Sequence, residues 1–315
     1  MEHVRADVPW YGVAEQTQMP SLIARTAPDI VHVPHWNVPV LSGAPRVVTI
    51  HDLLLLHEPM SAKSSMRGPA TRAIRQMGYR AILSQAVRNS RRILVPTQWV
   101  AEDIKRFFPS LATPVDVTGE GMPDVDASRW VDADPADPYL LYVGSAYPHK
   151  NLDVLLDAWT MIAKQHPTLS LVLAGEKDVF MTRLEDHVAR EGLSRVRFMG
   201  KVSDDVLAEL YRKAVAFVFP SRQEGFGLPP LEALAHGCPV IAAKATSLPE
   251  VLGQDGAYFF QPSDANDILR AVELVLIDPV GARKQARTQA VVLRQRHDWH
   301  RAAERTLEAY MEAIR

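Results

Sequence analysis

The sequence predicts an α/β protein made of two domains with doubly wound, parallel sheets. Short β-branched runs alternate with longer amphipathic stretches almost throughout the chain, which is the pattern of βα units. A connector rich in Asp, Pro and Gly interrupts this pattern at residues 119–138, and a length of 315 residues gives room for two cores. We therefore expect a first domain over residues 1–125, a second over 126–297, and a terminal helix over 298–315 that packs back on the first domain.

In the first half, the strands are expected at residues 29–33, 46–51, 92–95 and 115–118. Helices are expected at residues 66–87 and 98–107, the second capped by Thr97, and the Met and Leu side chains of Leu53–Leu56 and Met66–Met77 are expected to build core. The 28 residues before the first strand are polar and aromatic, and no element is predicted there. Four strands are few for a doubly wound domain, so one or two βα units are expected to be missing.

The second half is more regular and predicts a complete doubly wound sheet. Its helices are expected to start after Asn151, Ser203 and Pro229, and the chain ends in helices from Asn266 onward with a break near Asp278–Pro279. The expected strands are residues 139–143, 169–174, 195–199, 216–219, 240–242 and 258–260.

The composition excludes several classes of protein. Apolar residues make up 47 % of the chain, and the net charge of -2 gives no overall attraction to nucleic acid, although basic residues gather between Arg67 and Arg92. No apolar run reaches the ~18 residues of a spanning helix, so any membrane contact is expected to be peripheral. With Cys238 as the only cysteine and no readable signal peptide, we expect a cytoplasmic protein, peripheral at most to the inner face of the membrane.

The most informative motif follows the expected strand at residues 216–219, at the sheet edge where α/β proteins bind ligands. Residues 221–232 read SRQEGFGLPPLE, in which the glycines allow close approach of a ligand and the prolines suit a first helical turn. The N–H groups and dipole of that turn favour an anion such as a diphosphate. Glu224 in the loop and Glu232 in the first turn can accept hydrogen bonds from sugar hydroxyls. For Glu232 alone, complementing the helix dipole is the simpler interpretation; the whole string predicts a ligand site.

A second motif, YVGSAYPHKN at residues 142–151, follows the expected strand at 139–143. His149 and Lys150 stand at a helix start, where positive charge opposes the dipole unless something negative binds there. Lys150 as a phosphate ligand and Lys150 as a solvated loop lysine are both open interpretations.

A third motif, RVVTIHD at residues 46–52, places His51 and Asp52 at the end of a strand. His51 can donate to a reacting sugar or can simply be satisfied by backbone in a turn. His32, His35, His51 and His57 lack the one-face spacing of helical metal motifs, so no metal site is expected. The sequence also lacks the fingerprints of serine hydrolases, nicotinamide enzymes and P-loop NTPases.

Together these motifs resemble those of the retaining GT-B glycosyltransferases of family 4, the glycosyl transferase group 1 family. Residues 224–232 are similar to its E-x7-E motif, and residues 144–151 are similar to its G-x-x-x-P-x-K-N phosphate loop. Further segments that resemble the family are residues 29–39, 47–52, 95–104, 236–243 and 247–251. The resemblance implies a GT-B fold of two facing Rossmann-like domains, here with an amino-terminal domain that lacks its first βα units.

The resemblance also implies roles for individual residues. Glu224 would contact the hydroxyls of the donor sugar, Glu232 would hold the ribose, and His51 would lie near the anomeric centre across the cleft. The implied catalytic residues are His51, Glu224 and Lys150. The implied donor-binding residues are Gly144, Ser145, His149, Lys150, Phe226, Gly227, Leu228 and Glu232. No metal or other cofactor is expected, because the nucleotide diphosphate sugar is itself a substrate.

The implied reaction transfers a hexose, with retention, from a GDP- or UDP-linked donor to a glycan or a lipid-linked acceptor. The P-H-K-N variant resembles mannosyltransferases of polysaccharide biosynthesis, which favours GDP-mannose. Many relatives carry an arginine where this chain has Ser145, so Lys150 is expected to act with help from His149.

Relatives also open with a strand and a glycine-rich loop that this sequence lacks. The open sheet edge leads us to expect a homo-oligomer or a complementing chain. A catalytically weak donor-binding or scaffold subunit is the alternative function, and a sugar-nucleotide epimerase is a third.

Overall fold

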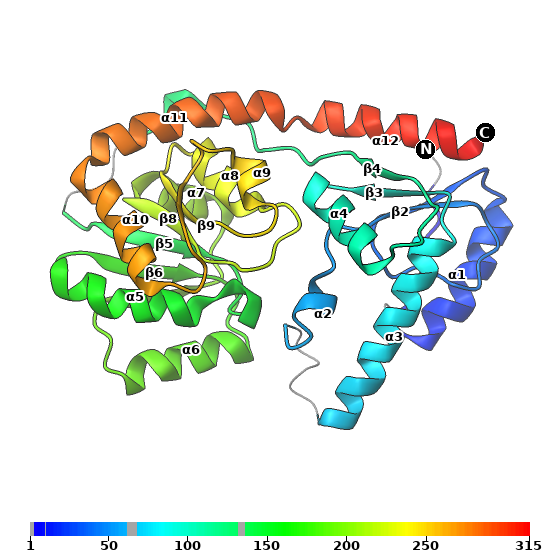
Figure 1. The fold of residues 1–315 in the computed structure, drawn as a ribbon, viewed down its shortest axis with the longest axis horizontal. Helices are drawn as coiled ribbons and strands as arrows, with labels where there is room; N and C mark the ends of the chain where they lie inside the picture. Colours follow the sequence, from blue (N-terminus) through cyan, green and yellow to red (C-terminus); the bar gives the residue numbers. More distant parts are fainter. Residues whose placement is uncertain (1–2, 10, 62–67, 132–135) are drawn as a thin grey trace. The chain divides into compact units, whose positions relative to one another are not determined.

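The computed structural model describes residues 3–9, 11–61, 68–131 and 136–315. The chain forms two compact units, Met1–Glu120 with His300–Arg315 and Gly121–Trp299, and each contains one parallel sheet (Figure 1). Along the chain, the boundary between the units falls between Glu120 and Gly121, slightly earlier in the connector than the predicted boundary after residue 125.

The first unit has a four-stranded sheet in the order β1-β2-β3-β4, with all neighbours parallel. Its strands are β1 (Val31–Val33), β2 (Arg46–Thr49), β3 (Arg92–Val95) and β4 (Val115–Val117). Each falls within a predicted strand, so the β-branched runs located the sheet correctly.

Helices cover both faces of this sheet. The helices of this unit are α1 (Val13–Thr26), α2 (Leu54–His57), α3 (Pro69–Arg88), α4 (Gln98–Phe107) and α12 (Trp299–Ile314). Alternate side chains of the strands point to opposite faces. Val48 and Ile93 pack with α3 and α4 on one face, whereas Val47 and Leu94 pack against Ala309 and Ala313 of α12 on the other. The carboxy-terminal helix therefore completes the core of the first unit.

Two expectations for this unit differ from the structure, and a third lies partly outside the described residues. The residues before β1 contain α1, which was not predicted because Pro20 interrupts its pattern and none of its residues is buried. The predicted helix at residues 66–87 is α3, and its first predicted residue, Met66, lies outside the described residues. Met77 is 68 % exposed and is not a core residue, whereas Leu53 is fully buried as expected.

The second unit has a six-stranded parallel sheet in the order β10-β9-β8-β5-β6-β7. Its strands are β5 (Tyr139–Val143), β6 (Ser170–Ala174), β7 (Val196–Gly200), β8 (Ala216–Phe219), β9 (Val240–Ala243) and β10 (Tyr258–Phe260). Every residue of β6, β8 and β9 is buried, because helices cover both faces, and this explains their continuous apolar sequences. The chain runs outward from β5 to β7 and then returns to the other side of β5 as β8. This reversal creates a topological switch point between β5 and β8.

The helices of the second unit begin near the predicted positions, with two corrections. Ser203 caps its helix by accepting from the N–H of Val206, but Asn151 is left-handed and makes no side-chain cap. The helix predicted after Pro229 begins at Leu228. The predicted break at Asp278–Pro279 is confirmed. The helices are α5 (Leu152–Gln165), α6 (Val179–Arg190), α7 (Asp204–Lys213), α8 (Leu228–Ala235), α9 (Leu248–Leu252), α10 (Ala265–Ile277) and α11 (Pro279–Arg296).

Within the described ranges, none of the helices combines the length and the apolar content that crossing a membrane requires.

Candidate functional site

The loops that follow β5 and β8 carry two of the predicted catalytic residues into direct contact. Lys150 Nζ lies 2.6 Å from Glu224 Oε1, and the two side chains are only 17 % and 15 % exposed. The ammonium group also lies 5.4 Å from the ring centroid of Phe219, the last residue of β8. Since β5 and β8 flank the switch point, this ion pair stands where a doubly wound sheet binds its ligand.

Glu224 changes the interpretation of Lys150. A lysine beside a helix start is unfavourable unless an anion neutralises it, and the Glu224 carboxylate is such an anion. The position of Lys150 therefore does not by itself require a phosphate. The pair nevertheless presents a cation and a hydrogen-bond acceptor together, and a ligand with phosphate and hydroxyl groups can engage both.

Asn151 fixes the two loops to each other. Its backbone is left-handed, with φ of 60°, and its side chain is buried. The side-chain amide Nδ2 donates to the carbonyl of Pro220 at 3.1 Å and to the carbonyl of Pro262 at 2.7 Å. One residue thus ties together the loops after β5, β8 and β10, which explains why an asparagine follows Lys150.

Two buried serines hold the backbone on either side of Glu224. Ser221 Oγ donates to the carbonyl of His149 at 3.2 Å, linking the β8 loop to the β5 loop. Ser247 Oγ lies 3.1 Å from the carbonyl of Glu224 and 3.3 Å from that of Phe226. Both serines are fully buried, so these bonds are shielded from water.

His149 is buried, and it cannot help Lys150 as a second cation. Burial, followed by the charges of Lys150 and Arg222, lowers the pKa of His149 to about 3. The ring is therefore neutral near pH 7, so any help that His149 gives Lys150 with a phosphate comes from hydrogen bonding and not from a second positive charge.

Glycine is required at three turns of the second unit, after β5, β6 and β8. Gly144 has φ of 143°, and a Cβ on Gly175 would meet the carbonyl oxygen of Gly144 at 2.0 Å, so the turns after β5 and β6 touch through backbone. Tyr142 OH donates to the carbonyl of Ser145 at 2.7 Å and fixes the same turn. Gly227 has φ of 100°, and a Cβ there would meet Leu248 Cδ2 at 2.7 Å.

The start of α8 offers backbone donors. The first N–H groups of a helix have no intrahelical acceptor. Pro229 and Pro230 in this turn have no backbone N–H group, so they leave no donor unsatisfied. The N–H groups of Gly227 and Leu228 remain, at the positive end of the helix dipole. The predicted donor-binding residues Phe226, Gly227 and Leu228 are thus consecutive at a helix terminus of the kind that favours anions.

Glu232 lies one turn further along α8 than predicted. Because the helix begins at Leu228, its first turn contains no acidic residue, and Glu232 is in the second turn. Its Oε2 accepts from Tyr211 OH at 3.2 Å, and burial raises the pKa of Glu232 above its ordinary value. Tyr211 was not singled out from the sequence, where it is one apolar position of the amphipathic helix α7.

His51, in the first unit, is held between two oxygen acceptors. Its Nδ1 lies 3.0 Å from Glu120 Oε1 and its Nε2 lies 3.2 Å from the carbonyl of Pro34. Neither a carboxylate nor a carbonyl can donate, so this geometry assigns a proton to both ring nitrogens. The hydrogen bond to Glu120 raises the pKa of His51, although 49 % of the side chain is exposed. Glu120 was missed in the sequence because it follows His51 by 69 residues.

The other histidines of the first unit have separate partners. His32 Nε2 contacts Thr49 Oγ1 and His57 Nε2 contacts Asp103 Oδ2, both at 2.7 Å. Asp52 accepts from the N–H of Leu54 and shapes the start of α2. In the described part of the chain, no three His, Cys, Asp or Glu side chains are grouped to hold a metal ion.

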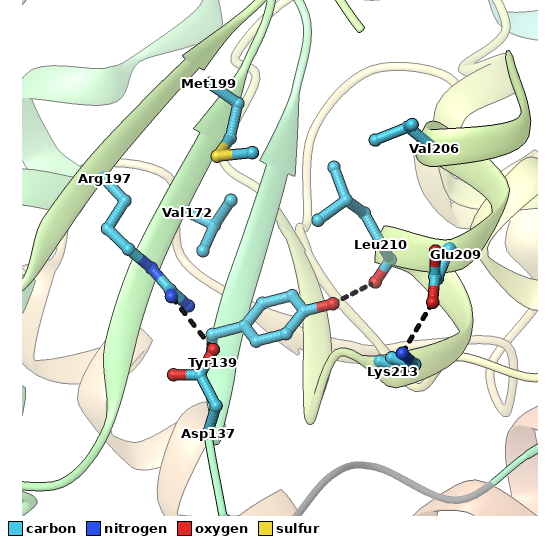
Figure 2. A pocket seen from close by; sticks show the side chains of 9 residues that line it. All are labelled: Asp137, Tyr139, Val172, Arg197, Met199, Val206, Glu209, Leu210 and Lys213. Atoms are coloured by element: carbon cyan, nitrogen blue, oxygen red, sulfur yellow. Dashed lines mark hydrogen bonds and ion pairs between the residues drawn. The ribbon is translucent and has the colours of Figure 1, made fainter. Parts of the chain in front are cut away.

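A separate pocket lies beside β5, β6, β7 and α7, and none of the predicted site residues lines it (Figure 2). Its charged side chains pair with each other, Arg197 with Asp137 at 2.9 Å and Lys213 with Glu209 at 2.6 Å. Tyr139, the first residue of β5, forms one wall, whereas the predicted motifs follow the opposite ends of the strands. This pocket is therefore not the candidate site.

Both halves of the chain match known protein families. Residues 126–292 match the family described as Glycosyl transferases group 1, and residues 3–122 match the family described as Glycosyltransferase Family 4. The two matches meet within the connector.

Curated relatives carry names of the same kind. The chain is 34 % identical over 176 residues to the O-antigen chain mannosyltransferase B of Escherichia coli, covering 55 % of this chain and 45 % of that protein. It is 30 % identical over 300 residues to the glycogen synthase of Mycobacterium tuberculosis (strain ATCC 25618 / H37Rv), covering 87 % and 70 %. The chain thus spans less than half the length of the first relative and more than two thirds of the second.

Solved structures confirm the predicted GT-B fold class. The sucrose-phosphate synthase from Thermosynechococcus elongatus has a TM-score of 0.76 at 23 % identity, over 95 % of this chain and 77 % of that one. Anabaena Alr3699/HepE in complex with UDP and glucose has a TM-score of 0.73 at 19 % identity, over 96 % and 84 %.

Proposed function

Because the chain belongs to the glycosyl transferases group 1 family, we propose that it transfers a hexose from a nucleotide diphosphate sugar to a glycan or a lipid-linked acceptor. The observation that carries the proposal is the Lys150–Glu224 pair at the switch point between β5 and β8. A sugar diphosphate has anionic phosphates next to sugar hydroxyls, and the pair offers a cation next to a hydroxyl acceptor. The name of the mannosyltransferase relative from Escherichia coli favours mannose, and hence GDP-mannose, as the donor.

In this proposal the diphosphate lies at the start of α8. Lys150 and the N–H groups of Phe226, Gly227 and Leu228 bind its oxygens, and the helix dipole adds to their effect. Negative charge grows on the diphosphate as the anomeric C–O bond breaks. Preorganised donors at that position stabilise the transition state, usually the largest single contribution to catalysis.

The two glutamates bind the two ends of the donor. Glu224 accepts hydrogen bonds from the hexose hydroxyls, and Glu232, oriented by Tyr211, accepts them from the ribose diol.

His51 acts as a hydrogen-bond donor. A ring that already carries both protons cannot accept another one, so His51 does not deprotonate the acceptor in this state. Transfer with retention has no need of that step if the acceptor oxygen attacks from the face of the departing diphosphate and gives its proton to a diphosphate oxygen. In this scheme no metal ion takes part.

The test is calorimetric titration of the chain with GDP, UDP and their hexose conjugates in the presence of EDTA. We expect micromolar binding of GDP and GDP-mannose, abolished by Lys150→Ala. Lys213→Ala is the matched control, because it breaks another lysine–glutamate pair of 2.6 Å, which lies on α7 beside the separate pocket. If no nucleotide binds, or if Lys150→Ala binds as well as the parent, the assignment is wrong.

A catalytically weak donor-binding subunit is the second candidate, favoured by the four-stranded sheet of the first unit. This second hypothesis predicts the same calorimetric binding of GDP and GDP-mannose, but no transfer of the sugar. Release of GDP from GDP-mannose in the presence of a glycan or lipid extract separates the two candidates, and only the transferase produces a new glycoside.

A further inference from the structure

His297 joins the carboxy-terminal end of α11 to the donor turn, the residues 226–228 that are proposed above to bind the diphosphate. It follows the last residue of α11 and is only 8 % exposed. Its ring meets the ring of Phe226 edge-on, with the centroids 5.2 Å apart and an interplanar angle of 86°. Phe226 is also buried, so water does not compete for this contact. His297 thus supports the side chain of a residue whose backbone N–H is proposed to bind the donor.

A hydrogen bond fixes the orientation of the His297 ring. Its Nε2 donates to the carbonyl of Val251 at 2.8 Å, because a carbonyl can only accept. Val251 is buried and lies in the last turn of α9, where a carbonyl has no intrahelical partner. Burial lowers the pKa of His297, so the ring is neutral near pH 7 and this N–H is its only one. Rotation of the ring would therefore leave a buried carbonyl without its donor.

The backbone of His297 is held as well. Its N–H donates to the carbonyl of Leu293 at 2.7 Å, and its carbonyl accepts from the N–H of Met122 at 2.9 Å. Met122 is itself buried. Because ring and backbone are both fixed, the His297 ring occupies a defined position against Phe226.

Helix α9 connects this contact to the backbone of the donor turn. At the start of α9, Ser247 Oγ lies 3.3 Å from the carbonyl of Phe226. In its last turn, the carbonyl of Val251 holds the ring of His297. The backbone and the side chain of Phe226 are thus both fixed to one buried framework. Such a framework suits a donor site, because N–H groups that stabilise a diphosphate act best when they are already in place.

We propose that His297 is a positioning residue for the donor diphosphate. It acts through Phe226, whose ring it contacts, and touches no substrate itself. By restricting that ring, it keeps the N–H groups of the donor turn directed at one place, so the diphosphate does not have to order them on binding. The inference rests on the proposed transferase function and adds to the donor site a residue that lies outside the sequence motifs.

Two substitutions separate the ring of His297 from its hydrogen bond. His297→Gln keeps an N–H donor but removes the ring, and it should weaken GDP binding in calorimetric titration about three- to tenfold, as expected for loss of one edge-to-face contact. His297→Phe keeps a ring against Phe226 and should bind GDP within about twofold of the parent. It should nevertheless have a lower melting temperature, because the carbonyl of Val251 loses its donor.

Phe226→Leu removes the same ring contact from the other side. It should weaken GDP binding by a factor similar to that of His297→Gln, so the test does not depend on the folding of one variant. Val275→Ala is the control for lost packing, since Val275 is fully buried in α10 and lies outside the donor site. This control should lower the melting temperature and bind GDP like the parent.

Guanosine, which lacks the diphosphate, gives a readout that a loosened fold would not. Its affinity, measured by saturation-transfer NMR, should be the same in His297→Gln and in the parent, because His297 acts on the diphosphate alone. UDP and uridine replace GDP and guanosine if the parent binds UDP.

Three results would overturn the proposal. They are an unchanged GDP affinity in His297→Gln, an equal loss of affinity for GDP and guanosine in that variant, and a loss in His297→Phe as large as that in His297→Gln. Failure of the proposed function looks different, because the parent itself then binds neither GDP nor UDP, and the role of His297 is rejected with it.

Discussion

The two units hold their candidate site residues in different ways. In the second unit, Lys150 and Glu224 stand on loops that the buried side chains of Asn151 and Ser247 tie together. In the first unit, half-exposed His51 is held by the Glu120 carboxylate and one carbonyl. The difference teaches that the loops carrying Lys150 and Glu224 are fixed by buried side chains of their own domain. The orientation of His51 instead depends on a half-exposed contact, and water competes for its hydrogen bonds. Substitutions at the site of the second unit should therefore affect donor binding and the free energy of unfolding. Substitutions beside His51 in the first unit should affect the protonation of His51.

The largest effect is expected at the ion pair of the second unit. Lys150→Ala should lower turnover of the donor by about 100- to 1000-fold, as expected for loss of one preorganised charge at the leaving group. Glu224→Ala should have a similar effect, and the double variant should lose much less than the product of the two, because the residues contact each other. Steady-state kinetics with thermal melts of each variant measures this. Strictly additive losses would show that the two residues act independently.

Asn151→Ala should lower the free energy of unfolding by about 2–4 kcal/mol. The variant forces an alanine into the left-handed region and leaves two carbonyls without their buried donor. Asn151→Gly keeps the backbone conformation and should lose less stability, although it should bind the donor nearly as poorly. Urea unfolding compares the two variants. An alanine variant as stable as the glycine variant would contradict the assigned backbone role.

Ser247→Ala should lower the free energy of unfolding by about 1–2 kcal/mol, because it removes a buried hydroxyl that lies within hydrogen-bond distance of two carbonyls. Thr288→Ala is the control, since Thr288 donates to one carbonyl on the exposed surface of α11 and should change stability by less than ~0.5 kcal/mol. If the two variants unfold at the same urea concentration, burial does not distinguish the two hydroxyls.

The smallest effect is expected in the first unit, where Glu120→Gln should lower the pKa of His51. The hydrogen bond to Glu120 is the largest cause of the raised pKa, and Asp52 adds to it. A raised pKa stabilises the fold below the unfolded value of about 6.5, and this contribution is lost as the pH rises through the folded value. The free energy of unfolding of the variant should therefore differ most from that of the parent at acid pH. The difference should be small, because solvent screens the interaction between His51 and Glu120.

Titration of the His51 ring by NMR measures this shift directly. Glu120→Asp, which keeps the charge, should retain more of it. An unchanged titration midpoint of His51 in Glu120→Gln would show that Glu120 does not stabilise the doubly protonated ring.

The sequence was sufficient for the features that depend on local pattern. The β-branched runs located both sheets, and the glycines and prolines after β8 located the start of α8 within two residues. The contacts that build the site join residues far apart in the chain, such as Lys150 with Glu224, 74 positions later. No local pattern contains such a pairing, which is why Glu120 and Tyr211 were missed.

Two errors have local causes. Asn151 was expected as a helix cap because asparagine is a common cap, but its left-handed backbone directs the amide toward two other loops. Met77 was expected in the core because it is apolar, yet only the three-dimensional position of α3 decides which side of that helix is covered.

The packing of α12 has a consequence for synthesis on the ribosome. Val47 and Leu94 are translated early, but Ala309 and Ala313, which cover them, follow the whole second unit. Translating residues 121–299 takes roughly 10–35 s at ~5–20 residues per second. For that time the face of the first sheet that carries Val47 and Leu94 lacks α12, so the nascent protein should be a substrate for chaperones that bind apolar surface.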